Sequence, residues 1–145
     1  RRRQDVVNLN EQQARDLLLN LLLQYRDVLI PDSGFIEDLL DLLSSSGVEK
    51  RLFSKLTDYI KKLCTYGEAA IGGRGDPMEH LSGYANLNAM RFLFDGSNIR
   101  ILFAFLDGKI YLLCAFYERK GKRNTEYSSY IPIALQRLDE LLEGV

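Results

Sequence analysis

Apolar residues recur at helical spacing in three segments of the first half of the chain. The first segment, residues 14–25, is rich in leucine; the second runs from residue 33 into the serine-glycine stretch at 44–47, and the third covers residues 48–63. Apolar positions three and four apart are typical of amphipathic helices packed on a core. The expected N-terminal caps are Asp32 or Ser33 for the second helix and a capping box of Ser46 with Glu49 for the third.

The second half of the chain has the pattern of strands. After a glycine-rich loop at residues 67–83, three apolar, aromatic-rich runs cover residues 88–95, 99–106 and 109–118. Asp107-Gly108, between the last two runs, is a strong signal for a two-residue hairpin turn. The runs therefore predict a three-stranded antiparallel meander, and their nearly continuous hydrophobicity indicates that helices cover both faces.

Two further elements complete the expected fold. A short apolar run that stops at Pro31 is compatible with an edge strand. Residues 126–143 predict a C-terminal helix, with Pro132 in its first turn and Gly144 at its end. We therefore expect an α+β fold in which N-terminal helices pack on a small twisted antiparallel sheet with a C-terminal helix.

The composition is that of an ordinary globular protein, since 46% of the 145 residues are hydrophobic and 27% are charged. No apolar run approaches the roughly 18 residues of a membrane span, and no signal-peptide pattern follows the N-terminal arginines. Cys64 and Cys114 both lie in apolar segments, where reduced core thiols are commoner than a disulfide. We therefore expect a soluble cytoplasmic protein.

Charge is distributed unevenly, although the net charge is only −1. Residues 1–50 contain six Lys and Arg against nine Asp and Glu, whereas residues 51–145 contain thirteen against eleven. A basic run is either a solvated loop or a nucleic-acid contact, and composition leaves both open. The basic excess is concentrated in Arg119, Lys120, Lys122 and Arg123.

Conventional catalytic motifs are absent from the sequence. A metal site needs several converging ligands, yet the chain has one histidine, His80, and its two cysteines lie fifty positions apart. There is neither a nucleophile elbow nor a phosphate-binding glycine motif. We therefore expect no metal and no cofactor, and we interpret His80 as a loop residue in preference to a catalytic base.

Three segments resemble, in order, the sheet of the RelE/HigB superfamily of bacterial toxins, in particular its phage-derived HigB-like branch. Pro77–Arg91 resembles the family's stretch in which proline, leucine and glycine lead into a strand that closes on arginine. Ile99–Phe103 resembles the next strand, whose arginine follows a turn. Leu112–Thr125 resembles an apolar strand that runs through an aromatic residue into paired cations, and a helix with Ala134 and Arg137 follows.

The resemblance covers residues 32–145 and implies a RelE-like toxin domain there, with residues 1–31 as an N-terminal helical extension. It implies the toxin of a type II toxin–antitoxin system, an mRNA interferase that cleaves mRNA in the ribosomal A site without a metal. The implied partners are a cognate antitoxin, mRNA and the ribosome. A non-enzymatic binding protein on the same fold, either a gyrase-poisoning ParE-like toxin or an inactive regulator, is the alternative.

Such cleavage drives a ribose 2′-hydroxyl onto the adjacent phosphate, so it needs a proton acceptor, cations and a proton donor. Arginine suits the phosphate because its planar fork meets two oxygens at once. A structural alternative pairs Arg91 and Arg100 with Asp95, Asp107 or Glu126 across the sheet. The implied site residues are Arg91 and Arg100 for phosphate, Lys120 as a further cation or proton-transfer group, Arg119, Lys122 and Arg123 for the RNA backbone, and Tyr117 or Tyr127 for stacking on a base.

The extension carries more leucines than one helix face can bury. Residues 17–23 contain six leucines, and a single apolar stripe about 100° wide cannot hold them all. Exposed apolar patches of this kind usually mark a partner surface. We therefore expect the first helix to mediate self-association or antitoxin docking.

Overall fold

The computed structural model describes residues 11–46, 48–94 and 97–144, so the N-terminal arginines lie outside the described part. The described residues form four α-helices, a 3-10 helix η2 (Gly67–Ala70) and one five-stranded sheet. The helices are α1 (Glu11–Gln24), α2 (Ser33–Ser46), α3 (Glu49–Tyr66) and α4 (Arg123–Glu143). The strands are β1 (Leu29–Pro31), β2 (Met78–His80), β3 (Asn88–Phe94), β4 (Ser97–Leu106) and β5 (Lys109–Tyr117).

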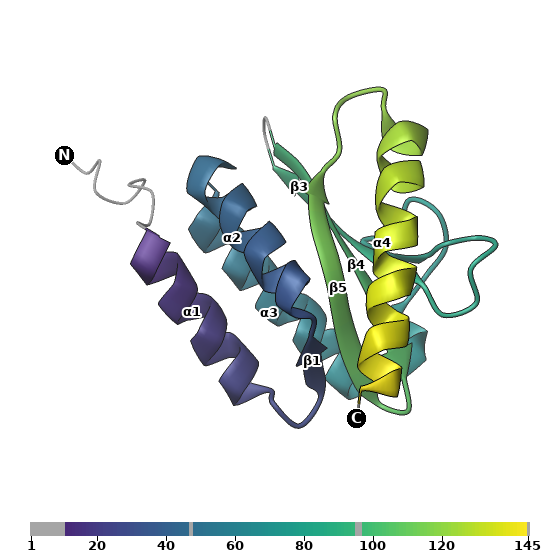
Figure 1. Cartoon of the computed structure of the whole chain (residues 1–145), viewed down its shortest axis with the longest axis horizontal. Coiled ribbons are helices and arrows are strands. Elements are labelled where there is room, and N and C mark those ends of the chain that lie inside the picture. Colours follow the sequence, from purple (N-terminus) through teal and green to yellow (C-terminus); the bar gives the residue numbers. More distant parts are fainter. Residues whose placement is uncertain (1–10, 47, 95–96, 145) are drawn as a thin grey trace.

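The strands lie in the order β1-β5-β4-β3-β2 (Figure 1). Strands β2 to β5 are antiparallel neighbours, whereas β1 pairs in parallel with residues 110–112 of β5. The turn between β4 and β5 is the predicted two-residue hairpin, in which Asp107 (φ 51°) and Gly108 (φ 76°) both adopt left-handed conformations. The sheet is therefore an antiparallel meander with one parallel edge strand.

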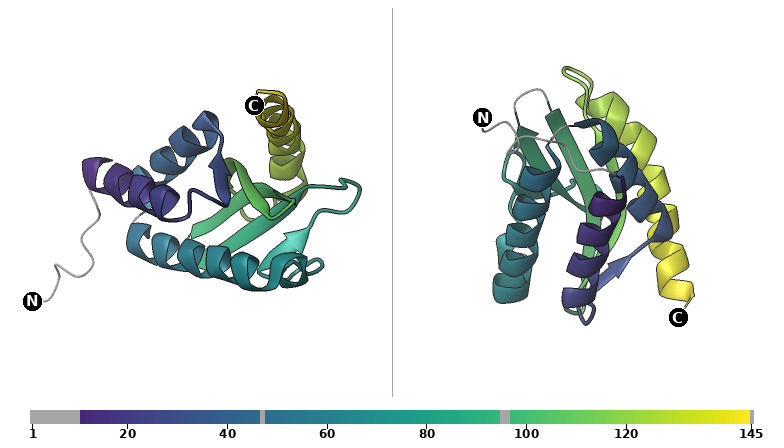
Figure 2. Two further views of the ribbon diagram at one scale, coloured as in Figure 1. Left: turned by 90° about the horizontal axis from the view of Figure 1, so that it is seen from below. Right: turned by 90° about the vertical axis from the view of Figure 1, so that its left-hand side faces the viewer.

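The sheet separates two apolar cores. Figure 1 looks onto the edge formed by β1 and β5, with α1, α2 and α3 on one side of the sheet and α4 on the other. The view from below in Figure 2 shows α3 and α4 on opposite faces. The first core joins α1, α2 and α3 to one face, and the second packs Ile131, Ala134 and Leu138 of α4 on the other.

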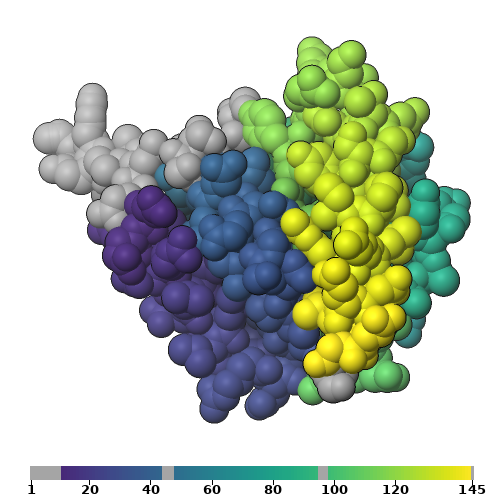
Figure 3. Space-filling model, viewed as in Figure 1, coloured from purple at the N-terminus to yellow at the C-terminus, as the bar shows by residue number. Residues whose placement is uncertain are grey.

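Side chains from α2 and α4 close the part of the β5 edge that β1 does not reach. Leu113 is a bulge in β5, because its neighbours Leu112 and Cys114 pair with consecutive residues of β4. Nη1 of Arg137, on α4, donates a 2.9 Å hydrogen bond to the Leu113 carbonyl and a 2.8 Å hydrogen bond to Oδ2 of Asp38 on α2. Figure 3 shows α2 and α4 meeting over this edge.

The structure confirms a mixed α+β fold, and it corrects the strand content. The sheet is mixed and not purely antiparallel, because β1 runs parallel to β5. Strand β2 falls inside the segment that we interpreted as loop, where Met78–His80 pairs with Asn88–Met90 of β3. His80 is therefore the last residue of a strand and not a loop residue. Residues 11–31 contribute α1 and β1 to the same fold.

The helix termini follow the predicted pattern only in part. Asp32 caps α2, since its Oδ2 accepts a 2.7 Å hydrogen bond from the Gly34 N–H. The predicted capping box at α3 is wrong, because the N-cap position belongs to Val48 and Ser46 is the last residue of α2. Pro132 does not lie in the first turn of α4, because that helix already begins at Arg123.

Burial divides the leucines of α1 and the two cysteines. Leu18 and Leu21 enter the first core, whereas Leu19 and Leu23 are 43% and 58% exposed. Cys114 is buried as expected, but Cys64 is exposed, and both are free thiols. No helix in the described ranges is long and apolar enough to span a membrane.

Candidate functional site

Two arginines stand opposite each other on the face of the sheet that α4 covers. Arg91 on β3 pairs with Arg100 on β4, and Arg100 pairs in turn with Phe116 on β5. Cross-strand partners point to the same face of a sheet, and Phe116 belongs to the core beneath α4. Because like charges directly opposite each other repel, this pair needs nearby carboxylates.

The buried carboxylate of Glu79 on β2 supplies one of these counter-charges. Its Oε1 lies 3.8 Å from Nε of Arg91, and its Oε2 accepts a 2.9 Å hydrogen bond from Nη2 of Arg123 at the start of α4. Arg91 also donates to the Gly75 carbonyl in the glycine loop, and its own carbonyl accepts a 2.6 Å hydrogen bond from the Tyr59 hydroxyl. Glu79 thus connects β2, β3 and α4.

Glu118 supplies the other counter-charge, at the end of β5. Arg100 is only 2% exposed. Its Nη1 donates a 2.6 Å hydrogen bond to Oδ1 of Asn98, and its Nε lies 3.0 Å from Oε1 of Glu118. The Arg100–Glu118 contact is an ion pair without hydrogen-bond alignment, since neither atom has a hydrogen-bond partner. The expected direct contact of Arg100 with phosphate does not fit this burial.

A cleft of about 490 Å³, which we call the terminal cleft, opens at this end of the sheet. It lies between the β3–β4 hairpin and the segment that links β5 to α4. Asn98 and Glu118, both held by Arg100, form part of its wall. Tyr117, Arg119 and Lys120 also line it, together with the apolar side chains of Leu93 and Phe94.

The four cations at residues 119–123 differ in their partners. Arg119 is bound to Glu126. Oε2 of Glu126 accepts a 2.8 Å hydrogen bond from Nε of Arg119 and a 3.2 Å hydrogen bond from the backbone N–H of the same residue. The hydrogen bond from the Arg119 side chain is the main reason that the pKa of Glu126 is lowered. Arg123 is bound to Glu79. Lys120 and Lys122 are exposed, and only Lys120 lines the terminal cleft.

The two tyrosines expected to stack on bases lie in different environments. Tyr117 is exposed and lines the terminal cleft. Tyr127 is buried, with its ring edge-on to Phe116 at 5.4 Å between centroids and the Arg123 guanidinium 4.6 Å from its centre. The ring of Tyr127 is therefore covered in this structure, and its stacking on a base stays a prediction. Burial raises the pKa of its hydroxyl, which stays protonated at neutral pH.

Unused hydrogen-bonding capacity gathers around these side chains. Within the described ranges, five buried side-chain polar atoms have no hydrogen-bond partner. Four of them belong to this end of the sheet, namely Nε of Arg91, Nε of Arg100, Oε1 of Glu118 and the hydroxyl of Tyr127. A buried polar group without a hydrogen bond costs about 1–3 kcal/mol. Three of these four atoms, the two guanidinium nitrogens and Oε1 of Glu118, belong to the ion pairs described above.

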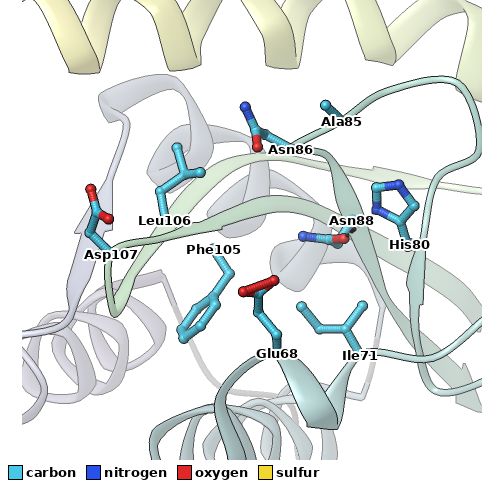
Figure 4. Close-up of a pocket in the computed structure, with 9 residues that line it drawn as sticks. All are labelled: Glu68, Ile71, His80, Ala85, Asn86, Asn88, Phe105, Leu106 and Asp107. Carbon is cyan, nitrogen blue, oxygen red and sulfur yellow. Dashed lines mark hydrogen bonds between the residues drawn. The ribbon is translucent and has the colours of Figure 1, made fainter.

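A second cavity, of about 450 Å³, lies at the opposite end of the sheet beside the β4–β5 turn. Figure 4 shows Glu68 pointing towards the sheet from η2 and the side chains of His80 and Asn88 lying next to each other on β2 and β3. Nδ1 of His80 is 3.0 Å from Oδ1 of Asn88. No group of three or more His, Cys, Asp or Glu side chains in the described ranges could hold a metal ion.

The structure therefore places the expected site residues in two adjoining groups. Three of them line the terminal cleft and Arg100 supports its wall, while Lys122 lies at the N-cap of α4. The second group surrounds Glu79 beneath α4. The cleft-lining residues are Tyr117, Arg119 and Lys120, and the residues around Glu79 are Arg91, Arg123 and Tyr127.

Sequence reasoning missed the two acids that organise the site. Arg91 and Arg100 pair with Glu79 and Glu118, not with Asp107 or Glu126, and Asp95 lies outside the described residues. Strand alternation could have indicated Glu118, because it stands two positions after the buried Phe116 and directly follows β5. Glu79 had no such signal, because β2 is too short for a pattern.

No protein-family model matches the sequence, and comparisons with curated proteins and with solved structures give no significant match. The function of this chain is therefore inferred from the geometry of the terminal cleft and of the residues behind it.

Proposed function

We propose that this chain is the toxin of a type II toxin–antitoxin pair, of the RelE/HigB kind, and that it cleaves mRNA on the ribosome at the terminal cleft without a metal. The observation that carries the proposal is the composition of the cleft wall. Arg119 and Lys120 offer positive charge, Tyr117 offers an exposed aromatic ring, and Glu118 offers a carboxylate. These are the groups that bind a phosphodiester, stack on a base and move a proton.

The electrostatics of the neighbouring residues also favour an RNA strand. Arg91, Arg100 and Arg123 face two carboxylates, Glu79 and Glu118, so that this group carries one excess positive charge. A phosphodiester group carries one negative charge. The N-terminus of α4 adds a partial positive charge beside the cleft.

A binding protein without catalysis is the second candidate, and one observation favours it. Arg91, Arg100 and Arg123 are all engaged by Glu79 or Glu118, which leaves fewer free cations to stabilise a phosphorane. Such a protein would retain RNA at the cleft, or dock another partner there, and leave the RNA intact.

Primer extension on abundant mRNAs separates the two candidates. Induction of the protein should produce new 5′ ends inside coding regions within minutes. Lys120→Ala should weaken them strongly, because the lysine lines the cleft, whereas Lys62→Ala, which removes an exposed cation on α3, should leave them unchanged. If induction gives no new 5′ ends while the purified protein still retains RNA on a filter, the protein binds RNA without cleaving it.

A further inference from the structure

Glu118 is the one carboxylate among the described residues that line the terminal cleft. Its side chain is 11% exposed, and its Oε1 is buried against Arg100. The second oxygen, Oε2, is therefore the one that can meet a ligand in the cleft. On the same wall, Lys120 supplies a cation within the same cavity.

Arg100 fixes the wall from behind. It holds Asn98 by a hydrogen bond of 2.6 Å and Glu118 by an ion pair of 3.0 Å, while remaining almost fully buried itself. A buried arginine that touches two cleft residues and no open solvent is suited to positioning and not to direct contact with RNA. The Glu118 carboxylate also offsets the charge of Arg100, which lies directly opposite Arg91 in the sheet.

Arg100 and Glu118 are held together by charge and not by a directional hydrogen bond. The Nε of Arg100 and the Oε1 of Glu118 lie close together but are not aligned as a hydrogen bond. The contact is therefore electrostatic and leaves Oε1 of Glu118 without a directional hydrogen bond. The Tyr127 hydroxyl nearby is also without a hydrogen-bond partner.

We propose, resting on the function proposed above, that Glu118 accepts the proton of the attacking 2′-hydroxyl and that Arg100 is its positioning residue. The 2′ oxygen bonds to phosphorus as its proton passes to Glu118. The bond from phosphorus to the 5′ oxygen breaks, and that oxygen takes a proton from the Lys120 ammonium group. The proton on Glu118 then returns to Lys120 through water, and the products are a 2′,3′-cyclic phosphate and a 5′-hydroxyl end.

The test uses the full chain, ribosomes programmed with a labelled mRNA, and the variant Glu118→Gln. This substitution keeps the shape and removes the proton acceptor, so kcat should fall about 10²- to 10⁴-fold. Binding to a 2′-O-methyl mRNA, which cannot be cleaved, should stay within about twofold of the wild-type value, since no interaction with phosphate is removed. Glu143→Gln, at an exposed position on α4, is the matched control and should cleave normally.

Two further variants separate catalysis from a loss of structure. Glu118→Asp keeps a carboxylate and should retain measurable cleavage and the acid limb of the pH–rate profile, which Glu118→Gln should lack. Arg100→Lys keeps the charge but not the double contact, so it should lower kcat about tenfold with little change in KM, as expected of a misplaced group.

The outcomes distinguish this inference from the function on which it rests. Cleavage by Glu118→Gln at the wild-type rate would overturn the role of Glu118 and leave the proposed function standing. Equal loss of activity in the Gln and Asp variants, with RNA binding lost in both, would also overturn it, because the residue would then serve binding or folding. No cleavage by the wild-type protein would remove the proposed function and this inference together.

Discussion

Gly34, at the start of α2, lies directly against the guanidinium group of Arg137 on α4. A Cβ atom at position 34 would overlap Cζ and Nη2 of Arg137 and lie 2.8 Å from its Nε. The guanidinium cannot move away freely, because it binds the Leu113 carbonyl and forms ion pairs with Asp32 and Asp38. The missing side chain at position 34 therefore allows α4 to be fastened to α2 across the edge of β5.

Gly34→Ala should consequently destabilise the protein by about 1–3 kcal/mol, the cost of leaving partners of a charged group unsatisfied. Urea unfolding followed by circular dichroism measures this change. Gly73→Ala is the matched control, since a Cβ there would meet open space, and it should be neutral or slightly stabilising. Equal stability of the two variants would show that Arg137 relocates without cost.

Glu79→Gln should destabilise the fold by about 3 kcal/mol. The substitution removes the buried carboxylate that pairs with both Arg91 and Arg123. The effect should appear as a lower urea midpoint. Glu68→Gln removes an exposed carboxylate from η2 and should change stability by less than about 0.5 kcal/mol. A mild effect of Glu79→Gln would mean that Arg91 and Arg123 turn to solvent instead.

Stability should fall at alkaline pH because of Cys114. Burial raises the pKa of its thiol from 9.0 to about 12. Above pH 9 the unfolded chain therefore releases a proton that the folded chain keeps, so the unfolded state gains up to about 1.4 kcal/mol per pH unit until pH 12. Below pH 9 the thiol contributes no pH dependence.

Urea titrations between pH 8 and 11 measure this slope, and Cys114→Ala should reduce it after correction for the cavity it creates. In the native protein at pH 8, a thiol reagent should label the exposed Cys64 and spare Cys114. Rapid labelling of both cysteines would contradict the burial of Cys114.

The exposed leucines of α1 should tolerate charge. Leu19→Glu with Leu23→Glu should leave the melting temperature nearly unchanged, because both side chains face solvent. If α1 is the self-association surface that we propose, the double variant should also show a lower mass in light scattering. Leu18→Glu is the contrasting variant and should unfold the protein, because Leu18 is fully buried.

An unchanged mass in the double variant would exclude self-association through α1. If the proposed toxin function holds, antitoxin docking would then be the remaining role for this surface, to be tested by co-purification with the protein encoded beside it.

Local signals predicted those parts of the fold that depend on neighbouring residues. The Asp107-Gly108 turn needs two left-handed residues, and that pair of residue types provides them. The cap at Asp32 likewise involves only the next two positions. In contrast, β2 is a strand only because Asn88–Met90 lies beside it, and β1 depends on a partner far along the chain. No local pattern contains that information.

Pro132 illustrates how tertiary packing overrides a local rule. Proline favours the first turn of a helix because it lacks an N–H, yet α4 begins at Arg123 and continues through it. The flanking residues Ile131 and Ala134 are buried against the sheet, which holds the helix together on both sides of the proline.

For the candidate site, the sequence indicated the cations but not their arrangement. Basic residues in order along the chain predicted a charged end of the sheet, and the structure places Arg91, Arg100 and Arg123 near one another. Which cations reach solvent depends on the strand register and on where Glu79 and Glu118 fall within it. The register is set by the pairing of segments that lie far apart in the sequence, and neither composition nor local patterns predict that pairing.

The parallel pairing of β1 has a consequence for how the chain is made. Asp27, just before β1, accepts a hydrogen bond from Lys109, 82 positions later. At a synthesis rate of 5–20 residues per second, the start of β5 is synthesised roughly 4 to 16 s after β1. During that interval the apolar faces of the first three helices have no sheet to cover them, so the nascent chain is most prone to misassociation before the β4–β5 hairpin has emerged.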